Sequence, residues 1–497
     1  MGCELLTTTE MSEADRLTIE GGTPGIELME TAGRAVADAA LREFPGIKRV
    51  LIAAGPGNNG GDGYVAARLL SESGCEVELC TLVPPSALKG DALLAAKAWT
   101  GPVTALADAN LTAPAKTDLV IDAVFGAGLT RGIDGDAAEF LDAVAKAGVP
   151  VLAVDVPSGI DGSTGEARGR APRADVTVTF FRAKPGHYLF PGRGHIGKLV
   201  VADIGIPAST LDRIAPKTFL NGPDLWGHAM PWPEVRAHKY NRGHAVVLSG
   251  PSHRTGAARL AARGALRIGA GLVTVASPPS AILVNAAHLT AIMLVPCGSD
   301  DALSAILADP RHNAACLGPA LGVGEKTKDL TQAALSSDAR LVLDADALTS
   351  YEDAPDQLFQ GIAGRNASVV LTPHEGEFKR LFPDIDNGSR LDRARTAAER
   401  SGAIIIFKGP DTVIAAPDGR AAINANGQSW LATAGSGDVL AGFVTGLVAQ
   451  SMPAFEAAAA AVWLHGEVGS GPGMIATDFP EALPAILQEL LSTRGDA

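Results

Sequence analysis

The chain has 497 residues and a mass of 50.7 kDa, which is enough for about two to four domains of ordinary size. Its 46% hydrophobic and 19% charged residues are typical of a globular protein and exclude a disordered one. A formal net charge of −14 and an aromatic content of 5% argue against nucleic acid as a partner, because such binding needs a basic surface or stacking side chains.

Cysteine usage and the N-terminal segment indicate the compartment. The five cysteines have no CxxC spacing, so neither a zinc site nor a disulfide framework is expected; they are Cys3, Cys75, Cys80, Cys297 and Cys316. The first 20 residues lack the basic and then apolar pattern of a signal peptide, and no apolar run approaches the ~20 residues of a membrane span. We therefore expect a cytoplasmic protein that does not act at a membrane.

The first half of the chain alternates apolar runs with alanine-rich stretches. The runs at 50–54, 119–124 and 151–156 are apolar except for Asp122 and Asp155, do not alternate with polar residues, and end in glycine-rich or polar turns. Such runs predict parallel strands buried on both faces, and the stretches 64–71 and 91–99 predict crossover helices. The N-terminal stretch 11–41 is also predicted to be helical. It could pack on its own sheet or on a second copy of the chain, so a homo-oligomer stays open.

A turn rich in glycine and asparagine, GPGNNGGDG at 55–63, follows the first predicted strand. Gly55, Gly57 and Gly60 fit GxGxxG, which is typical of dinucleotide-binding turns. However, Asp62 would place an anion at the helix end that a pyrophosphate would approach. We therefore favour a hydroxylated ligand or a cation at this turn.

Two further predicted strands in this half end in carboxylates, Asp122 and Asp155. Ligands of open α/β sheets bind beyond the carboxyl ends of the strands, so these side chains should meet Asn59 and Ser158 in one crevice. Carboxylate, amide and hydroxyl oxygens together suit a hard cation.

These segments resemble the NAD(P)H-hydrate epimerases, the YjeF N-terminal type, over most of residues 1–215. The matching segments are GPGNNGGDGYVAARLL, IDAVFGAGLTRG, AVDVPSGIDGSTG and FFRAKPGHYLFPG with HIGKLVVADIGIP. The resemblance implies a potassium ion held by Asn59, Asp122 and Ser158. It implies substrate contacts at Asn58, Asn59, Gly60, Gly61, Asp62, Gly126, Ala127, Gly128, Leu129, Thr130, Arg131 and Gly132. Asp155 is then expected to be catalytic, first as the acid that assists C–O cleavage and then as the base that guides water to the opposite face.

The second half repeats the alternation, with buried strands predicted at 245–248, 341–343, 369–371 and 403–407. The segment 207–240 between the halves is rich in Pro, Trp, His and charge and has no clear period. We expect one domain over residues 1–215, a linker over 216–238 and a second domain over 239–497.

The strongest pattern of the second domain is the glycine turn TAGSGDVLAG at 433–442, which opens an alanine-rich helix. Backbone N–H groups at 435–437 can hold developing negative charge, and Asp438 is a candidate base for a substrate hydroxyl. The turn resembles the anion hole of ribokinase-like phosphotransferases.

Other strand ends of this domain carry compatible groups. Lys408 and Thr412 could face phosphate oxygens, and Asp344 with Asp346 could serve Mg²⁺ or a ribose. His374 has two glutamates nearby but no HExxH order, so a substrate hydrogen bond is favoured over a metal.

The whole set resembles the ADP-dependent NAD(P)H-hydrate dehydratases over roughly residues 225–485. By position, the substrate contacts are Ala257, Gly322, His374 and Asp438, with Asp438 catalytic. The ADP or AMP contacts are Lys408, Gly409, Pro410, Asp411, Thr412 and Gly437. The resemblance also implies Mg²⁺ and ADP as co-substrate. One departure lies in GPALG at 318–322, where Ala320 stands at a position that is more often Gly in the family.

Together, these resemblances imply an α/β protein of two domains, a Rossmann-like three-layer αβα domain followed by a ribokinase-like αβα domain. The expected activity is repair of hydrated NADH and NADPH by an epimerase fused to a dehydratase. The main alternative is a ribokinase-like kinase of a vitamin or sugar with an accessory nucleotide-binding domain. A non-catalytic nucleotide-binding module and an NAD-dependent oxidoreductase are weaker alternatives.

Overall fold

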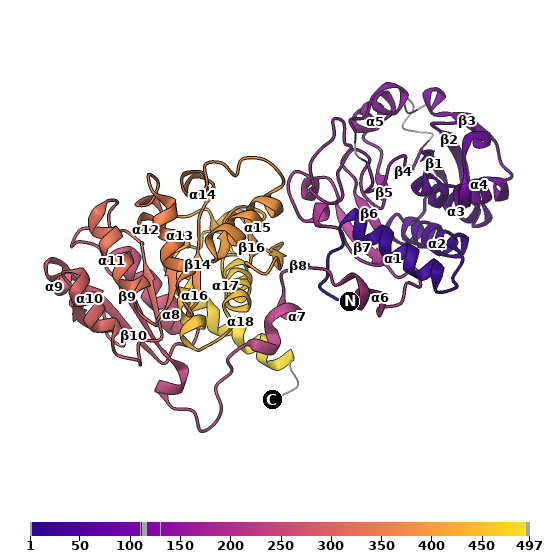
Figure 1. Cartoon of the computed structure of the whole chain (residues 1–497). Helices are drawn as coiled ribbons and strands as arrows, with labels where there is room; N and C mark the ends of the chain where they lie inside the picture. The colour runs from indigo at the N-terminus through magenta and orange to yellow at the C-terminus, as the bar shows by residue number, and fades with distance from the viewer. Residues whose placement is uncertain (1, 110, 112–116, 130, 494–497) are drawn as a thin grey trace. The chain divides into compact units, whose positions relative to one another are not determined.

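The computed structural model describes residues 2–109, 111, 117–129 and 131–493, which form two compact units that divide between Thr218 and Phe219 (Figure 1). Thr130, an expected substrate contact, lies outside the described residues. Within these ranges, no helix combines the length and the hydropathy that crossing a membrane requires.

The described residues of the first unit build a seven-stranded sheet in the order β3-β2-β1-β4-β5-β6-β7. The strands are β1 (Arg49–Ala54), β2 (Glu76–Thr81), β3 (Val103–Ala105), β4 (Leu119–Ala123), β5 (Val151–Val154), β6 (Val176–Phe180) and β7 (Lys198–Ala202). All neighbouring strands are parallel. The strand order reverses between β1 and β4, and a crevice at such a switch point is where ligands of doubly wound sheets bind.

Helices cover both faces of this sheet, as the apolar runs predicted. They are α1 (Thr8–Glu20), α2 (Gly25–Glu43), α3 (Asn58–Glu72), α4 (Gly90–Ala98), α5 (Gly135–Ala147) and α6 (Thr210–Ile214). Helices α2, α3 and α4 share one apolar cluster with the sheet, and α5 packs in a second cluster on the opposite face. Alternate residues of one strand enter the two clusters, Ile52 the first and Leu51 the second.

Local signals in the sequence fix several helix ends. Thr7 caps α1 through a reciprocal box in which Thr7 N–H donates to Glu10 at 2.8 Å and Glu10 N–H donates to Thr7 Oγ1 at 3.3 Å. Gly148 ends α5 in the left-handed conformation at φ 65°, which glycine adopts without a steric penalty.

The described residues of the second unit build a ten-stranded sheet in the order β11-β10-β9-β12-β13-β14-β15-β16-β17-β8. The strands are β8 (Thr218–Leu220), at the boundary, β9 (His244–Leu248), β10 (Leu272–Ser277), β11 (Met293–Pro296), β12 (Ala314–Leu317), β13 (Arg340–Leu343), β14 (Val369–Leu371), β15 (Ile404–Phe407), β16 (Val413–Ala415) and β17 (Ala421–Ile423). The strands from β11 to β15 pair in parallel, whereas β15, β16 and β17 pair antiparallel. With the parallel sheet of the first unit, this confirms the expected α/β class.

The helices of the second unit are α7 (Pro223–Trp226), α8 (Gly256–Arg267), α9 (Ile282–His288), α10 (Asp300–Leu307), α11 (Glu325–Leu335), α12 (Asp346–Thr349), α13 (Pro355–Ala363), α14 (Glu375–Leu381), α15 (Arg390–Ser401), α16 (Ser436–Ala449), α17 (Ala454–Val468) and α18 (Phe479–Thr493). Helices α8 and α16 pack very closely, because a Cβ on Gly442 would lie 2.2 Å from the carbonyl oxygen of Ala261. This packing fixes the start of α16, which carries Asp438.

The stretch 216–238, expected to be a linker, contains β8 and α7. The Trp226 side chain of α7 is 1% exposed, and its ring centroid lies 5.7 Å from that of Trp463. Burial of this large apolar surface ties part of the stretch into the core of the second unit.

Candidate active sites

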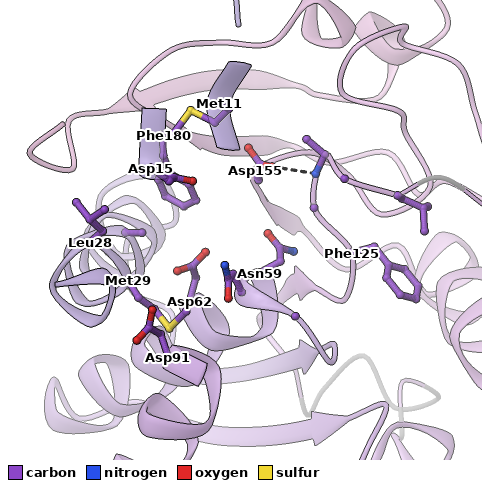
Figure 2. Close-up of a pocket in the computed structure, with 18 of the residues that line it drawn as sticks. Met11, Asp15, Leu28, Met29, Asn59, Asp62, Asp91, Phe125, Asp155 and Phe180 are labelled. Atoms are coloured by element: carbon purple, nitrogen blue, oxygen red, sulfur yellow. Dashed lines mark hydrogen bonds between the residues drawn. The ribbon is translucent and has the colours of Figure 1, made fainter. Parts of the chain in front are cut away.

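The first unit has a pocket of about 550 Å³ at the carboxyl ends of β1, β4 and β5 (Figure 2). Met11 of α1 and Leu28 and Met29 of α2 form an apolar wall. Carboxylate and amide side chains occupy other parts of the lining (Figure 2). A largely apolar pocket with a few convergent polar groups is typical of a small-molecule site.

Most residues expected from the sequence to contact substrate in this unit line that pocket, as does Asp155. They are Asn58, Asn59, Asp62, Gly126, Ala127, Gly128, Leu129 and Arg131. Gly60 and Gly61 do not line it: a Cβ on Gly60 would lie 2.0 Å from the Gly55 carbonyl oxygen, and one on Gly61 would lie 2.5 Å from Met29 Sδ. These two glycines allow close packing of α3. Gly132 is also absent from the lining.

Asp155 follows β5 in a left-handed conformation, with φ at 68°. Its Oδ2 accepts a hydrogen bond from the Ala127 N–H at 2.9 Å. Its Oδ1 accepts from Lys184 Nζ at 2.6 Å and from Thr179 Oγ1 at 3.0 Å. Burial alone would raise the pKa of this carboxyl, but the Lys184 ammonium and these hydrogen bonds lower it to about 2. Asp155 is therefore held as a carboxylate.

Two buried side chains fix the position of Asp155. Lys184 is 1% exposed and also donates to Thr179 Oγ1 at 2.7 Å. His187 Nδ1 accepts from the Lys184 N–H at 2.9 Å, so its Nε2–H donates to the Asp155 carbonyl oxygen, 2.8 Å away. Burial lowers the pKa of His187 to about 4, so the ring is neutral and holds the backbone of Lys184 and Asp155 in place through its two hydrogen bonds.

Asp62 and Asp15 are the other carboxyl groups near Asp155. Asp62 is 8% exposed, and its pKa is raised well above the usual range by burial and by the charges of Asp155 and Asp15. Burial also raises the pKa of Asp15 on α1, to about 6, although Lys184 opposes the rise. Asp155 is thus a carboxylate paired with a cation, whereas Asp62 and Asp15 retain protons more readily.

The expected potassium ligands lie at the junction of β1, β4 and β5. Ser158 Oγ donates to Asp122 Oδ1 at 2.6 Å and accepts from the Phe125 N–H at 2.8 Å. Asp122 is 1% exposed, and burial raises its pKa even though Ser158 donates to it twice. The Asn59 Nδ2 atom is buried without a hydrogen-bond partner. A buried carboxylate beside hydroxyl, carbonyl and amide oxygens is a donor set that fits a hard monovalent cation.

In the second unit, the expected anion hole is a turn that begins α16. Gly435 is its N-cap at φ 87° and Asp438 lies in the first helical turn. His465 Nε2 lies 3.0 Å from the Ser436 carbonyl oxygen, and burial lowers the pKa of this histidine to about 4. The neutral ring therefore holds the turn by donating to it. The Ser436 N–H donates to the Thr433 carbonyl oxygen at 3.3 Å, whereas the N–H groups that follow it in the first turn of α16 lack an intrahelical acceptor and can face an anion.

Lys408, directly after β15, contacts Asp344 at the end of β13 and lies near Glu377 on α14. Its Nζ donates to Asp344 Oδ1 at 2.7 Å and lies 3.9 Å from Glu377 Oε2. A Cβ on Gly437 would lie 3.6 Å from the same Nζ, so the ammonium reaches the glycine turn. Burial and the Asp344 charge raise the pKa of Asp438 to about 6, while Lys408 opposes the rise. A carboxylate with this pKa is suited to act as a base near neutral pH.

The other expected contacts of the second unit lie on loops at the same edge of the sheet. His374 caps α14, accepts at Nδ1 from the Gly376 and Glu377 N–H groups, and leaves its 56%-exposed side chain facing solvent. The loop from Gly409 to Thr412 is closed by a 2.8 Å hydrogen bond from Thr412 Oγ1 to the Gly409 carbonyl; Pro410 and the buried Asp411 lie within it. Ala257 lies in the first turn of α8.

The loop GPALG at 318–322 approaches the backbone of Gly250 closely. Gly322 N–H donates to Asp346 Oδ2 at 2.8 Å, with Gly322 at φ 96°. Ala320 has φ 57°, a left-handed conformation that favours glycine, and its carbonyl oxygen lies 2.0 Å from where a Gly250 Cβ would be. The departure noted in the sequence therefore falls at a strained position.

Sequence reasoning gave no role to Lys184, Thr179, His187 or Asp15. Lys184 and His187 lie inside the segment FFRAKPGHYLFPG, so the resemblance included them without identifying their partner. A lysine within an apolar segment could have indicated a buried ion pair, because lysine is almost never buried unless it is paired. Asp15 gave no local signal, since it lies on an ordinary amphipathic helix.

Comparisons with known proteins were made for the whole chain. A family model described as YjeF-related protein N-terminus matches residues 25–186, and one described as NAD(P)H-hydrate dehydratase matches residues 245–473. The bifunctional NAD(P)H-hydrate repair enzyme Nnr of Moorella thermoacetica is 36% identical over 98% of this chain and 97% of its own length. The enzyme of the same name from Synechocystis is 35% identical over 94% of this chain and 90% of its own. The crystal structure of ADP/ATP-dependent NAD(P)H-hydrate dehydratase from Bacillus subtilis with ATP/Mg²⁺ is 26% identical, covers 55% of this chain and 98% of that chain, and has a TM-score of 0.48.

Proposed function

The chain belongs to the family of bifunctional NAD(P)H-hydrate repair enzymes, and from this premise we propose how its two units divide the reaction. The first unit interconverts the R and S forms of hydrated NADH and NADPH. The second unit dehydrates the S form to NADH or NADPH, with ADP as the co-substrate. The observation that carries this assignment is the similarity to such enzymes along 98% of the chain.

Epimerisation requires reversible loss of the hydroxyl at carbon 6 of the reduced ring. That carbon also bears the ring nitrogen, so departure of the hydroxyl leaves a cation that the nitrogen stabilises. Asp155 is an anion in the pocket lining, fixed by Lys184 and the Ala127 N–H. A fixed carboxylate can stabilise the cation and orient the water that adds to it. With its pKa lowered to about 2, Asp155 is poorly suited to the acid step expected from the sequence.

We propose that Asn59, Asp122 and Ser158 hold a potassium ion. When bound, the ion would supply positive charge to the buried Asp122 carboxylate and so stabilise the loop that follows β4. The hydrogen bond from the Phe125 N–H to Ser158 Oγ already links this loop to the expected ligands.

The second unit acts by phosphorylation followed by elimination. Asp438 accepts the proton of the substrate hydroxyl, whose oxygen attacks the β-phosphoryl group of ADP, and AMP leaves. Phosphate then departs from carbon 6 and the ring double bond is restored. The N–H groups of the glycine turn and the Lys408 ammonium stabilise phosphoryl charge. The loop from Gly409 to Thr412 is proposed to contact the AMP moiety, and Ala257, Gly322 and His374 to contact the hydrated nucleotide. Mg²⁺, when bound, would neutralise phosphate oxygens.

The test is recovery of absorbance at the reduced-nicotinamide band from a mixture of both epimers of hydrated NADPH with K⁺, Mg²⁺ and ADP, repeated with ATP. Full recovery supports both activities. Recovery of about half, the share of the S form, would contradict the role of the first unit. A stable phosphorylated product in place of NADPH would favour the kinase alternative.

Two matched variants separate the units in this assay. Asp438→Asn is expected to abolish recovery and to leave interconversion of the epimers intact. Asp155→Asn is expected to do the reverse, leaving recovery limited to the S form. Recovery at the parent rate by Asp438→Asn would refute its role as the base.

A further inference from the structure

We propose that Asp62 is the acid of the first unit, and that it delivers its proton to the departing hydroxyl of the hydrated ring. This inference rests on the proposed epimerase function of the pocket. It assigns a chemical step to a residue that the sequence predicts only as a substrate contact.

The position of Asp62 carries the proposal. Its side chain lies on the first turns of α3 and lines the pocket, and Figure 2 shows its carboxyl group pointing into the cavity. It is only 8% exposed, and among the described residues no hydrogen-bond or ion-pair partner is recorded for its carboxyl group. Because this carboxyl group opens onto the cavity, a ligand there can receive its hydrogen bond.

The charged groups around the cavity favour Asp62 over its neighbours as the proton carrier. Lys184 pairs with Asp155 at 2.6 Å and keeps it ionised, so Asp155 does not carry the proton. Asp91 of α4 lies against the N-terminus of α2, where a Cβ on Gly25 would be 2.3 Å from its Oδ2. Asp15 of α1 also lines the pocket but is more exposed than Asp62. Asp62 faces the negative charges of Asp155 and Asp15, and burial together with those charges raises its pKa well above the ordinary aspartate value, so it retains a proton more readily than Asp155 does.

The step balances with water alone. The Asp62 carboxyl protonates the hydroxyl oxygen while the C6–O bond breaks. The bonding electrons leave with the oxygen, and the ring nitrogen lone pair forms a double bond to carbon 6. A water molecule then adds to the opposite face of the planar cation and releases one proton to solvent, while the Asp62 carboxylate takes up one proton from solvent through the open side of the pocket, which restores the acid. Asp155, still ionised beside Lys184, stabilises the cation between the two events.

The experiment uses the full chain with the R epimer of hydrated NADPH, K⁺ and no ADP, so that the second unit is silent. The epimers are separated by chromatography, and the uncatalysed rate is subtracted at each pH. Asp62→Asn is expected to lower kcat at least ~100-fold with little change in KM, the usual effect of losing a general acid. The parent rate is expected to fall at alkaline pH as Asp62 loses its proton, and the residual rate of the variant is expected to lack this fall.

Two controls address folding and specificity. Dehydration of the S epimer with ADP by the same preparation tests the second unit, and hydrogen exchange of peptides from β4 to β6 tests the first. Asp62→Glu keeps a carboxyl group in the cavity and is expected to recover at least tenfold over Asp62→Asn.

Each outcome has a definite meaning. An Asp62→Asn rate above one-tenth of the parent rate, or equal rates for the Asn and Glu variants, would overturn the proposal. The proposal would also be overturned if Asp15→Asn, and not Asp62→Asn, lost both the rate and its decline at alkaline pH. The proton carrier would then be Asp15. Failure of the parent chain to interconvert the epimers would instead refute the epimerase function on which the proposal rests.

Discussion

Removal of the Lys184 ammonium should destabilise the first unit through the charge that it leaves on Asp155. The Lys184 side chain is 2% exposed and the Asp155 side chain 16% exposed, so the pair is largely shielded from water. Despite burial, Lys184, together with the Ala127 N–H, lowers the pKa of Asp155 from the ordinary 3.8 to about 2, and the whole difference is worth about 2.5 kcal/mol. Breaking a buried ion pair typically costs ~3–5 kcal/mol. We expect Lys184→Met to lower the free energy of unfolding of this unit by about 2–4 kcal/mol near neutral pH.

The assay is urea unfolding followed by hydrogen exchange of peptides from β4 to β6, which reports on the first unit alone. The matched control is the double variant Lys184→Met with Asp155→Asn, which removes the unpaired charge and should restore at least half of the lost stability. If Lys184→Met lowers the free energy of unfolding by less than about 0.5 kcal/mol, the reasoning is refuted, because substitutions of exposed residues alone cause changes of that size. A double variant as unstable as the single one would refute it as well.

Three further predictions follow from the geometry of both units. The dehydratase rate should fall as the pH drops through about 6, because burial and Asp344 raise the pKa of Asp438 to about 6 and only the carboxylate accepts a proton; a rate–pH profile without this fall would contradict it. Ala320→Gly should raise the free energy of unfolding by about 1 kcal/mol in thermal melts, since φ 57° strains an alanine, and unchanged stability would argue against such strain. Asp62→Asn should raise the Tm of the first unit at alkaline pH, because burial raises the pKa of Asp62 and ionisation there costs stability. The gain should vanish below the ordinary aspartate pKa of 3.8, where Asp62 is protonated in both the folded and the unfolded state; a gain independent of pH would point to packing instead.

The sequence determined the architecture of each unit to a large extent. The apolar runs at 50–54 and 151–154 form central parallel strands, because a strand covered by helices on both faces has no solvent-facing residues. The carboxyl ends of parallel strands lie at one edge, so the expectation that Asn59, Asp155 and the loop after β4 meet followed without coordinates. The turn at 433–442 was predicted for the same reason, since its glycines start a helix beside a sheet edge.

Only the tertiary structure decided which of these groups carry charge and which carry protons. Lys184 meets Asp155 across 29 positions of the chain, and Asp15 reaches the pocket from a helix that precedes the first strand. Gly60 and Gly61 proved to pack against Gly55 and Met29, although they share a motif with the cavity-lining Asp62. Periodicity and turn chemistry act over a few residues and therefore fix elements. A pKa depends on burial and on charges that folding brings from distant segments, so the roles of the carboxyl groups emerge only in the folded chain.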